Sequence, residues 1–232
     1  MVALVNYLVA EKFKEKTGID VISLPKYTRL DTPVSAHADM LLSVIDNYIF
    51  IYEEYYEANK VLFLSLEGKY KIVKIKQECK REYPGDIALN VLVIGKKIFC
   101  KVKNVAAEII SYAKENGYKL INISQGYSAC STLVINENTA ITGDKGVYNA
   151  LIKEKVKTLL ISAENIKLDG YNHGFIGGCG VVLDNKLYLL GEIKYIPDCD
   201  KIVELLNEEN CTCFEILTGD VCDFGGIKLL NL

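Results

Sequence analysis

The sequence lacks the features that mark secreted, membrane-spanning and nucleic-acid-binding proteins. No basic leader precedes the first apolar run, and Glu11 and Lys12 interrupt that run too early for a signal core or a membrane span. The net charge is −3, so a general electrostatic attraction for nucleic acid or anionic lipid is not expected. We therefore predict a cytoplasmic protein without nucleic-acid or membrane partners.

Patterns for metal binding are also scarce. The chain has eight cysteines but no Cys-x-x-Cys, and its one close pair is Cys211 and Cys213. A structural zinc site would require Cys199, Cys222 or His173 to join that pair through folding. In a chain of this length without an export signal, reduced thiols are more typical than a disulfide framework. We expect no bound metal and no cofactor.

The segment 177–180, Gly-Gly-Cys-Gly, has the composition of a phosphate-binding loop but not its context. Such loops lead into the N-terminus of a helix, whereas here the strand pattern 181–183 follows. Close approach between backbone segments explains these glycines better.

A repeated pattern of strands and helices accounts for most of the chain. Half of the 232 residues are apolar, which is enough for a large core. Apolar hairpins have their turns near residues 46, 95, 137 and 185, and a shortened copy ends in the strand 227–230. The units recur at intervals of roughly 40 to 50 residues, a period typical of propellers and closed arrays. We predict one domain over residues 1–232, an α/β fold of five ββαβ units in a ring.

The first unit gives less regular predictions than the others. Residues 4–16 predict a helix that ends at Gly18. The apolar run 61–66 predicts a strand, and a second strand follows at 70–75.

A ring of five such units places the turns before the hairpins at one end of a central axis. Blades of the WD type contain no helix, so they do not fit this pattern. The functional site is therefore expected in the turns. Their polar and thiol-bearing residues are His37, Asp39, Gln125, Ser128, Cys130, Asn172, His173, Cys179, Asp220, Cys222 and Asp223.

These residue types are those of nucleophilic catalysis by a thiol. A nucleophilic cysteine needs an acid or base partner and a group that orients it, which His37 and Asp39 would supply for Cys222 or Cys130. Structural roles compete with this interpretation. A histidine often forms a hydrogen bond within its own turn, and a free cysteine often packs as a small hydrophobe. Asp144 and Asp220 also fit turn or helix-cap positions.

The pattern resembles the penteins, the superfamily of guanidino-group modifying enzymes that includes arginine deiminase, dimethylarginine dimethylaminohydrolase and the amidinotransferases. The resemblance rests on the five-unit ring, on His37-Ala38-Asp39 before an apolar hairpin, and on Cys222 in the last unit. It implies a five-bladed α/β-propeller. The runs that resemble an uncharacterised bacterial group beside this superfamily are 35–40, 125–131, 141–144, 174–178 and 223–227.

The resemblance also implies an activity on a small guanidino or amidine compound. Asp39 would hold the planar guanidinium through paired hydrogen bonds. The Cys222 thiolate would attack the guanidinium carbon, and His37 would protonate the leaving amine and then activate water. This implies a hydrolase or an amidinotransferase. The further substrate-binding residues that we expect are Asp144, Gln125, Asn172, His173, Asp220 and Asp223.

Two departures from the family pattern keep alternatives open. The His-x-Asp motif lies in the first unit and not in the middle of the chain, and Asp223 directly follows Cys222. A flanking carboxylate raises the pKa of a thiol, which makes Cys130 a rival nucleophile. The fold also serves binding alone, as in the ribosome-binding proteins of the translation initiation factor 6 type. A pentein that binds a small ligand or a macromolecular partner without catalysis is therefore the alternative.

Overall fold

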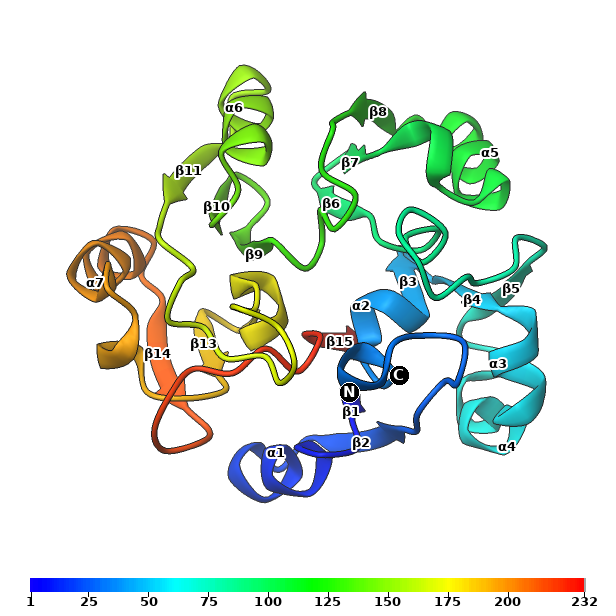
Figure 1. The fold of residues 1–232 in the computed structure, drawn as a ribbon, viewed down its shortest axis with the longest axis horizontal. Coiled ribbons are helices and arrows are strands. Elements are labelled where there is room, and N and C mark those ends of the chain that lie inside the picture. Colours follow the sequence, from blue (N-terminus) through cyan, green and yellow to red (C-terminus); the bar gives the residue numbers. More distant parts are fainter. Residues whose placement is uncertain (232) are drawn as a thin grey trace.

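The computed structural model describes residues 1–231, which form five small sheets around one axis (Figure 1). Each sheet has three strands, the first antiparallel to the second and the second parallel to the third. Helices connect the second and third strands on the outside of the ring (Figure 1). The predicted five-bladed α/β-propeller of ββαβ units is confirmed.

Four sheets follow one another along the chain. The first contains β3 (Leu42–Ile45), β4 (Tyr48–Tyr52) and β5 (Lys71–Ile75), with helices α3 (Glu53–Ala58) and α4 (Lys60–Phe63). The second contains β6 (Leu92–Ile94), β7 (Lys97–Cys100) and β8 (Lys119–Asn122), with α5 (Ala107–Glu115). The third contains β9 (Thr132–Asn136), β10 (Thr139–Thr142) and β11 (Lys157–Leu160), with α6 (Lys145–Lys153). The fourth contains β12 (Gly180–Leu183), β13 (Lys186–Leu189) and β14 (Thr212–Glu215), with α7 (Cys199–Glu208).

The fifth sheet joins the two ends of the chain. It contains β15 (Ile227–Leu230), β1 (Val2–Asn6) and β2 (Asp20–Leu24), with α1 (Ala10–Thr17). Strand β15 lies antiparallel to β1 with Leu230 opposite Val2, and both termini lie close together (Figure 1). The shortened C-terminal copy in the sequence is thus one strand of a full unit that the N-terminal segment completes.

Two predicted elements were wrong. Residues 2–6 form a strand and not the start of a helix, and α1 begins only at Ala10, although it ends at Gly18 as predicted. All five residues of β1 are buried, and a short apolar run of this kind does not distinguish a fully buried strand from a helix. Residues 61–66 form α4 and a 3-10 turn and not a strand.

The loops that lead into the first strand of each sheet lie at one end of the axis. The predicted hairpin turns are confirmed; for example, β3 and β4 pair up to Ile45 and Tyr48, and β12 and β13 pair up to Leu183 and Lys186. The loop before β3 includes the short helix α2 (Ala38–Leu41), all four residues of which are buried. The loop before β12 includes a 3-10 turn, Ile176–Cys179. Among the helices within residues 1–231, none has both the length and the apolar character that crossing a membrane requires.

Candidate functional site

All five loops that lead into the inner strands line one pocket of about 650 Å³ at the loop end of the axis. The loop before β3 contributes His37 and Met40, and the loop before β6 contributes Asp86. The loops before β9, β12 and β15 contribute, among others, Cys130, Phe175 and Asp223. The fold therefore brings residues from five distant stretches of the chain into one site.

His37 and Asp223 form a buried pair on this pocket. The His37 Nδ1 lies 3.7 Å from Asp223 Oδ1, and both side chains are almost fully buried. Burial lowers the pKa of His37, an effect that the nearby Asp223 opposes. Burial raises the pKa of Asp223, and His37 opposes this rise. Desolvation thus favours the neutral forms, whereas proximity favours the ion pair.

Backbone groups hold Asp223 in this position. Its Oδ2 accepts a hydrogen bond from the Phe175 N–H at 2.8 Å, and its Oδ1 accepts one from the Gly225 N–H at 2.9 Å. Gly225 has φ +81° and lies against His37, so that a Cβ there would overlap the imidazole. A Cβ on Gly178 would overlap the Asp223 carboxylate. The close backbone approach that the sequence predicts for the 177–180 run is found at Gly177, where a Cβ would overlap the carbonyl oxygens of Ala129 and Thr132.

A layer of side chains from three neighbouring blades borders the pocket on the axis. Met40, Asn90 and Cys130 each lie two residues before an inner strand. The Asn90 amide donates to Cys130 Sγ at 2.9 Å and to Met40 Sδ at 3.4 Å, and the Asn90 Oδ1 accepts from the Ala129 N–H at 2.8 Å. Asn90 therefore connects three blades, and it fixes the position of the Cys130 thiol.

The surroundings of the Cys130 thiol disfavour its deprotonation. It is 4% exposed, and burial raises its pKa well above the usual value. The carboxylates of Asp39 and Asp223 raise the pKa further, while the hydrogen bond from Asn90 opposes the rise. A thiolate at this position would therefore need a compensating positive charge.

Asp39 is buried on the axis and does not line the pocket. Its side chain is 2% exposed, and neither carboxylate oxygen has a hydrogen-bond partner within residues 1–231. Burial raises its pKa to about 6, an effect that the positive charge of Lys228 opposes. The predicted guanidinium-binding carboxylate is thus close to Cys130 but screened from the pocket.

Asp86 is one of the acidic residues that line the pocket, together with Asp31, Glu82 and Asp223. It is 6% exposed, and its Oδ2 accepts a hydrogen bond from the Tyr127 hydroxyl at 2.7 Å. Its Oδ1 is buried without a partner in the described part of the chain. Burial raises the pKa of Asp86, and the Tyr127 hydrogen bond opposes this rise. Tyr127 packs between Tyr83 and Phe175, with ring centroids at 5.5 and 6.0 Å.

A polar bridge spans the mouth of the pocket. The Asp31 carboxylate accepts hydrogen bonds from Arg81 on one oxygen and from the Tyr171 hydroxyl on the other, the latter at 3.0 Å. The three residues come from the loops before β3, β6 and β12. We call this set, Asp31, Arg81 and Tyr171, the mouth bridge.

The structure brings together some of the predicted site residues and separates others. Those that line the pocket are His37, Cys130, Asn172, His173 and Asp223. Asp144 caps α6 by accepting from the Val147 N–H at 2.8 Å, and its other oxygen accepts from the Gln125 amide at 2.7 Å. Neither Asp144 nor Gln125 lines the pocket, and Asp220 is an exposed loop residue.

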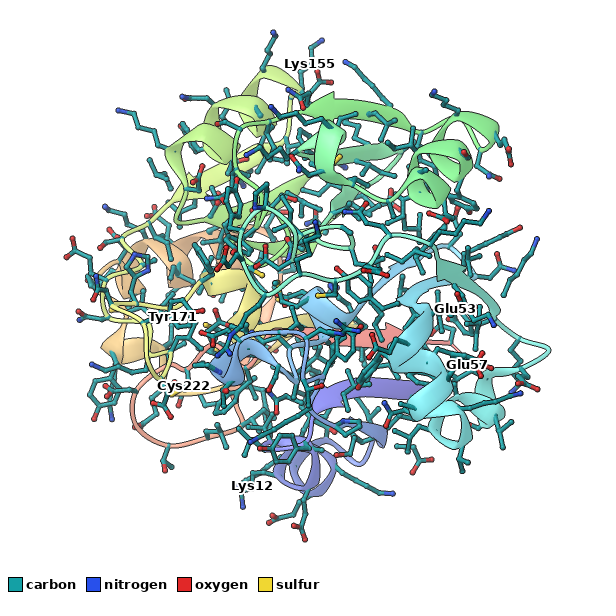
Figure 2. All side chains as sticks on the ribbon, turned by 45° about the vertical axis from the view of Figure 1, so that its right-hand side comes forward. Lys12, Glu53, Glu57, Lys155, Tyr171 and Cys222 are labelled. Carbon is teal, nitrogen blue, oxygen red and sulfur yellow. The ribbon has the colours of Figure 1, made fainter. Side chains whose placement is uncertain are left out.

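Cys222 lies on the far side of the His37 and Asp223 pair. It lines a separate pocket of about 320 Å³ that also contacts His37 and Lys167. Cys222 forms a β-bridge with Lys167, in the loop that also carries Tyr171. Figure 2 shows Cys222 and Tyr171 on the same side of the molecule. Burial raises the pKa of the Cys222 thiol, as do Asp220 and Asp169. Cys222 and Cys130 are therefore approached from different cavities.

Sequence reasoning missed several residues of the site. These are Asp31, Arg81, Tyr83, Asp86, Asn90, Tyr127 and Tyr171. For Asn90 a signal was present, since it occupies in the second unit the position of Cys130 in the third, two residues before the inner strand. Asp86 and the mouth bridge have no such signal because the loops differ in length and conformation between units. Within residues 1–231, no cluster of three or more His, Cys, Asp or Glu side chains is arranged to hold a metal ion.

The fold is the five-bladed α/β-propeller of the penteins, as predicted from the resemblance. The chain belongs to the family described as Family of unknown function (DUF6873), which matches residues 5–228. No curated protein sequence matches the chain.

Solved structures of penteins show the same fold. A cysteine-to-serine mutant of dimethylarginine dimethylaminohydrolase from Pseudomonas aeruginosa, in complex with citrulline, matches with a TM-score of 0.58 at 10% identity, over 92% of this chain and 91% of that one. SxtG, an amidinotransferase from Microseira wollei, matches with a TM-score of 0.56 at 13% identity, over 96% and 92% of the two chains. The agmatine deiminase of C. jejuni matches with a TM-score of 0.51 at 11% identity, over 93% and 75%.

Proposed function

We propose that the protein binds a small compound with a guanidinium or amidinium group in the pocket at the loop end of the axis. The observation that carries this proposal is Asp86, a buried carboxylate on the pocket wall with one oxygen unpartnered. A planar cation donates paired hydrogen bonds to such a group. It also stacks favourably on aromatic rings such as Tyr127 and Phe175. The citrulline-bound structural neighbour, a relative of this fold, agrees with a ligand of this size.

A thermal-shift panel tests the charge and the shape of the ligand. Compounds of equal size that carry a guanidinium, an amidinium, a primary ammonium or a neutral urea are compared at the same concentration. Ligand binding to the native state raises Tm with concentration, so the guanidinium and amidinium members should raise it and the urea should not. Equal shifts for the urea and the guanidinium would rule out recognition of a cation by Asp86.

Covalent catalysis is the second candidate, favoured by the presence of Cys130 on the same pocket as His37 and Asp223. A bound cation would lower the pKa of the buried thiol, which would pass its proton to His37 and become the thiolate. The thiolate would form a C–S bond at the amidinium carbon, and an amine would leave with a proton from His37. Water would then cleave the C–S bond and restore the thiol, which gives a hydrolase.

Intact-mass measurement with a reactive amidine distinguishes binding from catalysis. A single adduct on Cys130 that is lost in Cys130→Ser supports the covalent route. Labelling of Cys222, which lines the neighbouring pocket, would transfer the nucleophile role to that residue. Reversible binding with no adduct on either thiol leaves the protein as a binding pentein.

A further inference from the structure

A second cavity lies on the axis, on the strand side of the ring. Its volume is about 190 Å³, and it shares no lining residue with the pocket at the loop end. The inner strands of all five sheets contribute to it, with Ser43 from β3, Val93 from β6, Thr132 from β9, Gly180 from β12 and Lys228 from β15. We call it the strand-side cavity.

The backbone makes this cavity polar. Each inner strand is the end strand of its three-stranded sheet, so it is hydrogen-bonded to a neighbour on one edge only. The cavity is lined by residues of these five end strands. Free N–H groups at a strand edge are donors for an anion, and so is the hydroxyl of Ser43. The Thr132 hydroxyl already donates to Thr142 Oγ1 at 3.3 Å.

Lys228 gives the cavity a positive charge. It is the one charged residue among those that line the cavity, and no carboxylate lies within 4 Å of its ammonium in the described residues 1–231. Its positive charge lowers the pKa of Asp39, whose two buried oxygens have no hydrogen-bond partner in the described residues. Lys228 is therefore a lining residue of the cavity whose positive charge acts on the buried Asp39.

We infer that the strand-side cavity is a binding site for a small oxyanion, held by the Lys228 ammonium and by strand-edge donors. The size of the cavity limits the ligand. Pockets for drug-sized molecules have volumes of about 300–1,000 Å³, so one of this volume suits an anion of a few heavy atoms. Inorganic phosphate and an acetate-sized carboxylate share the required chemistry. This site is independent of cation binding at the loop end.

A purely structural role is the competing explanation for Lys228. In that case the ammonium serves only to offset the buried charge of Asp39. Loss of Lys228 would then lower stability, but the native protein would have no affinity for anions.

An NMR titration of ¹⁵N-labelled protein distinguishes anion binding from a purely structural role of Lys228. Phosphate and acetate are added in separate arms at constant ionic strength. We expect at least one of the two anions to shift the resonances of the Val93, Gly180 and Ile227 amides in a saturable way. Saturation with phosphate would indicate a tetrahedral ligand, and saturation with acetate would indicate a planar one. Affinity should fall at least tenfold in Lys228→Met and be unchanged in Lys186→Met, which alters an exposed lysine on β13.

Lys228→Arg keeps the test valid if the methionine variant does not fold, because it retains the charge and should retain binding. The inference is overturned if neither anion produces saturable shifts in the wild-type protein. It is also overturned if Lys228→Met folds and binds as tightly as the wild type.

Discussion

At the scale of single residues, Asn90 holds the centre of the ring together. Its amide donates to the Asp39 carbonyl at 3.1 Å and to Cys130 Sγ, and its oxygen accepts from the Ala129 N–H. Asn90→Ala would leave these buried groups unpaired, so we expect a loss of about 2–4 kcal/mol in the free energy of unfolding. Urea denaturation measures this loss. Asn138→Ala, in an exposed hairpin turn, is the control and should cost well under half as much.

The buried carboxylate of Asp39 gives stability a defined pH dependence. Its pKa is raised to about 6 in the folded state, compared with about 4 in an unfolded chain. The native state therefore binds more protons between these values, and stability falls as the pH rises from 4 to 6. Asp39→Asn should flatten this fall and raise stability at pH 8 by about 1–3 kcal/mol relative to wild type. Denaturation curves at pH 4 and pH 8 test this, and a variant less stable than wild type at pH 8 would contradict it.

At the scale of elements, the mouth bridge connects the loops before β3, β6 and β12. Its partners are partly exposed, Arg81 at 63% and Asp31 at 35%, so its contribution to global stability is small, about 0–1 kcal/mol. We expect Asp31→Asn to accelerate hydrogen exchange in the loops 78–86 and 168–175 with little change in Tm. Glu54→Gln, which breaks the similarly exposed pair with Arg29, is the matched control. Unchanged exchange in both loops would show that the bridge does not restrain the mouth.

The elements also show where local sequence patterns are sufficient. Turns near 46, 95, 137 and 185 follow from apolar alternation around short polar segments, and all four are confirmed. Strand β1 could not be predicted in this way, since its place depends on β15, more than 200 residues away. The same limit applies to the site. The loop residues His37, Cys130 and Asp223 were predicted as candidates, whereas Asp86 became visible only through its contact with Tyr127 and the pocket.

At the scale of the whole molecule, the ring is closed by the pairing of β15 with β1. Because the termini lie close together, a short linker between them should be tolerated, and new ends in the Asp184–Asn185 hairpin turn should give a folded circular permutant (Figure 1). Truncation after Gly226 removes β15 and leaves β1 with an open edge, so we expect loss of the cooperative unfolding transition. Size-exclusion chromatography and thermal unfolding test whether the circular permutant is folded and whether the truncated chain has lost its cooperative transition. A truncated chain that unfolds like wild type would show that closure contributes little.

The central claim is that the loop-end pocket recognises a planar cation through Asp86. Isothermal titration of the strongest guanidinium or amidinium compound into wild type, Asp86→Asn and Asp184→Asn tests it most directly. Asp184→Asn removes the same charge in an exposed turn with positive φ, which asparagine tolerates. We predict saturable binding to wild type, at least tenfold weaker binding to Asp86→Asn, and no change for Asp184→Asn. Equal affinity of wild type and a folded Asp86→Asn variant would contradict the claim.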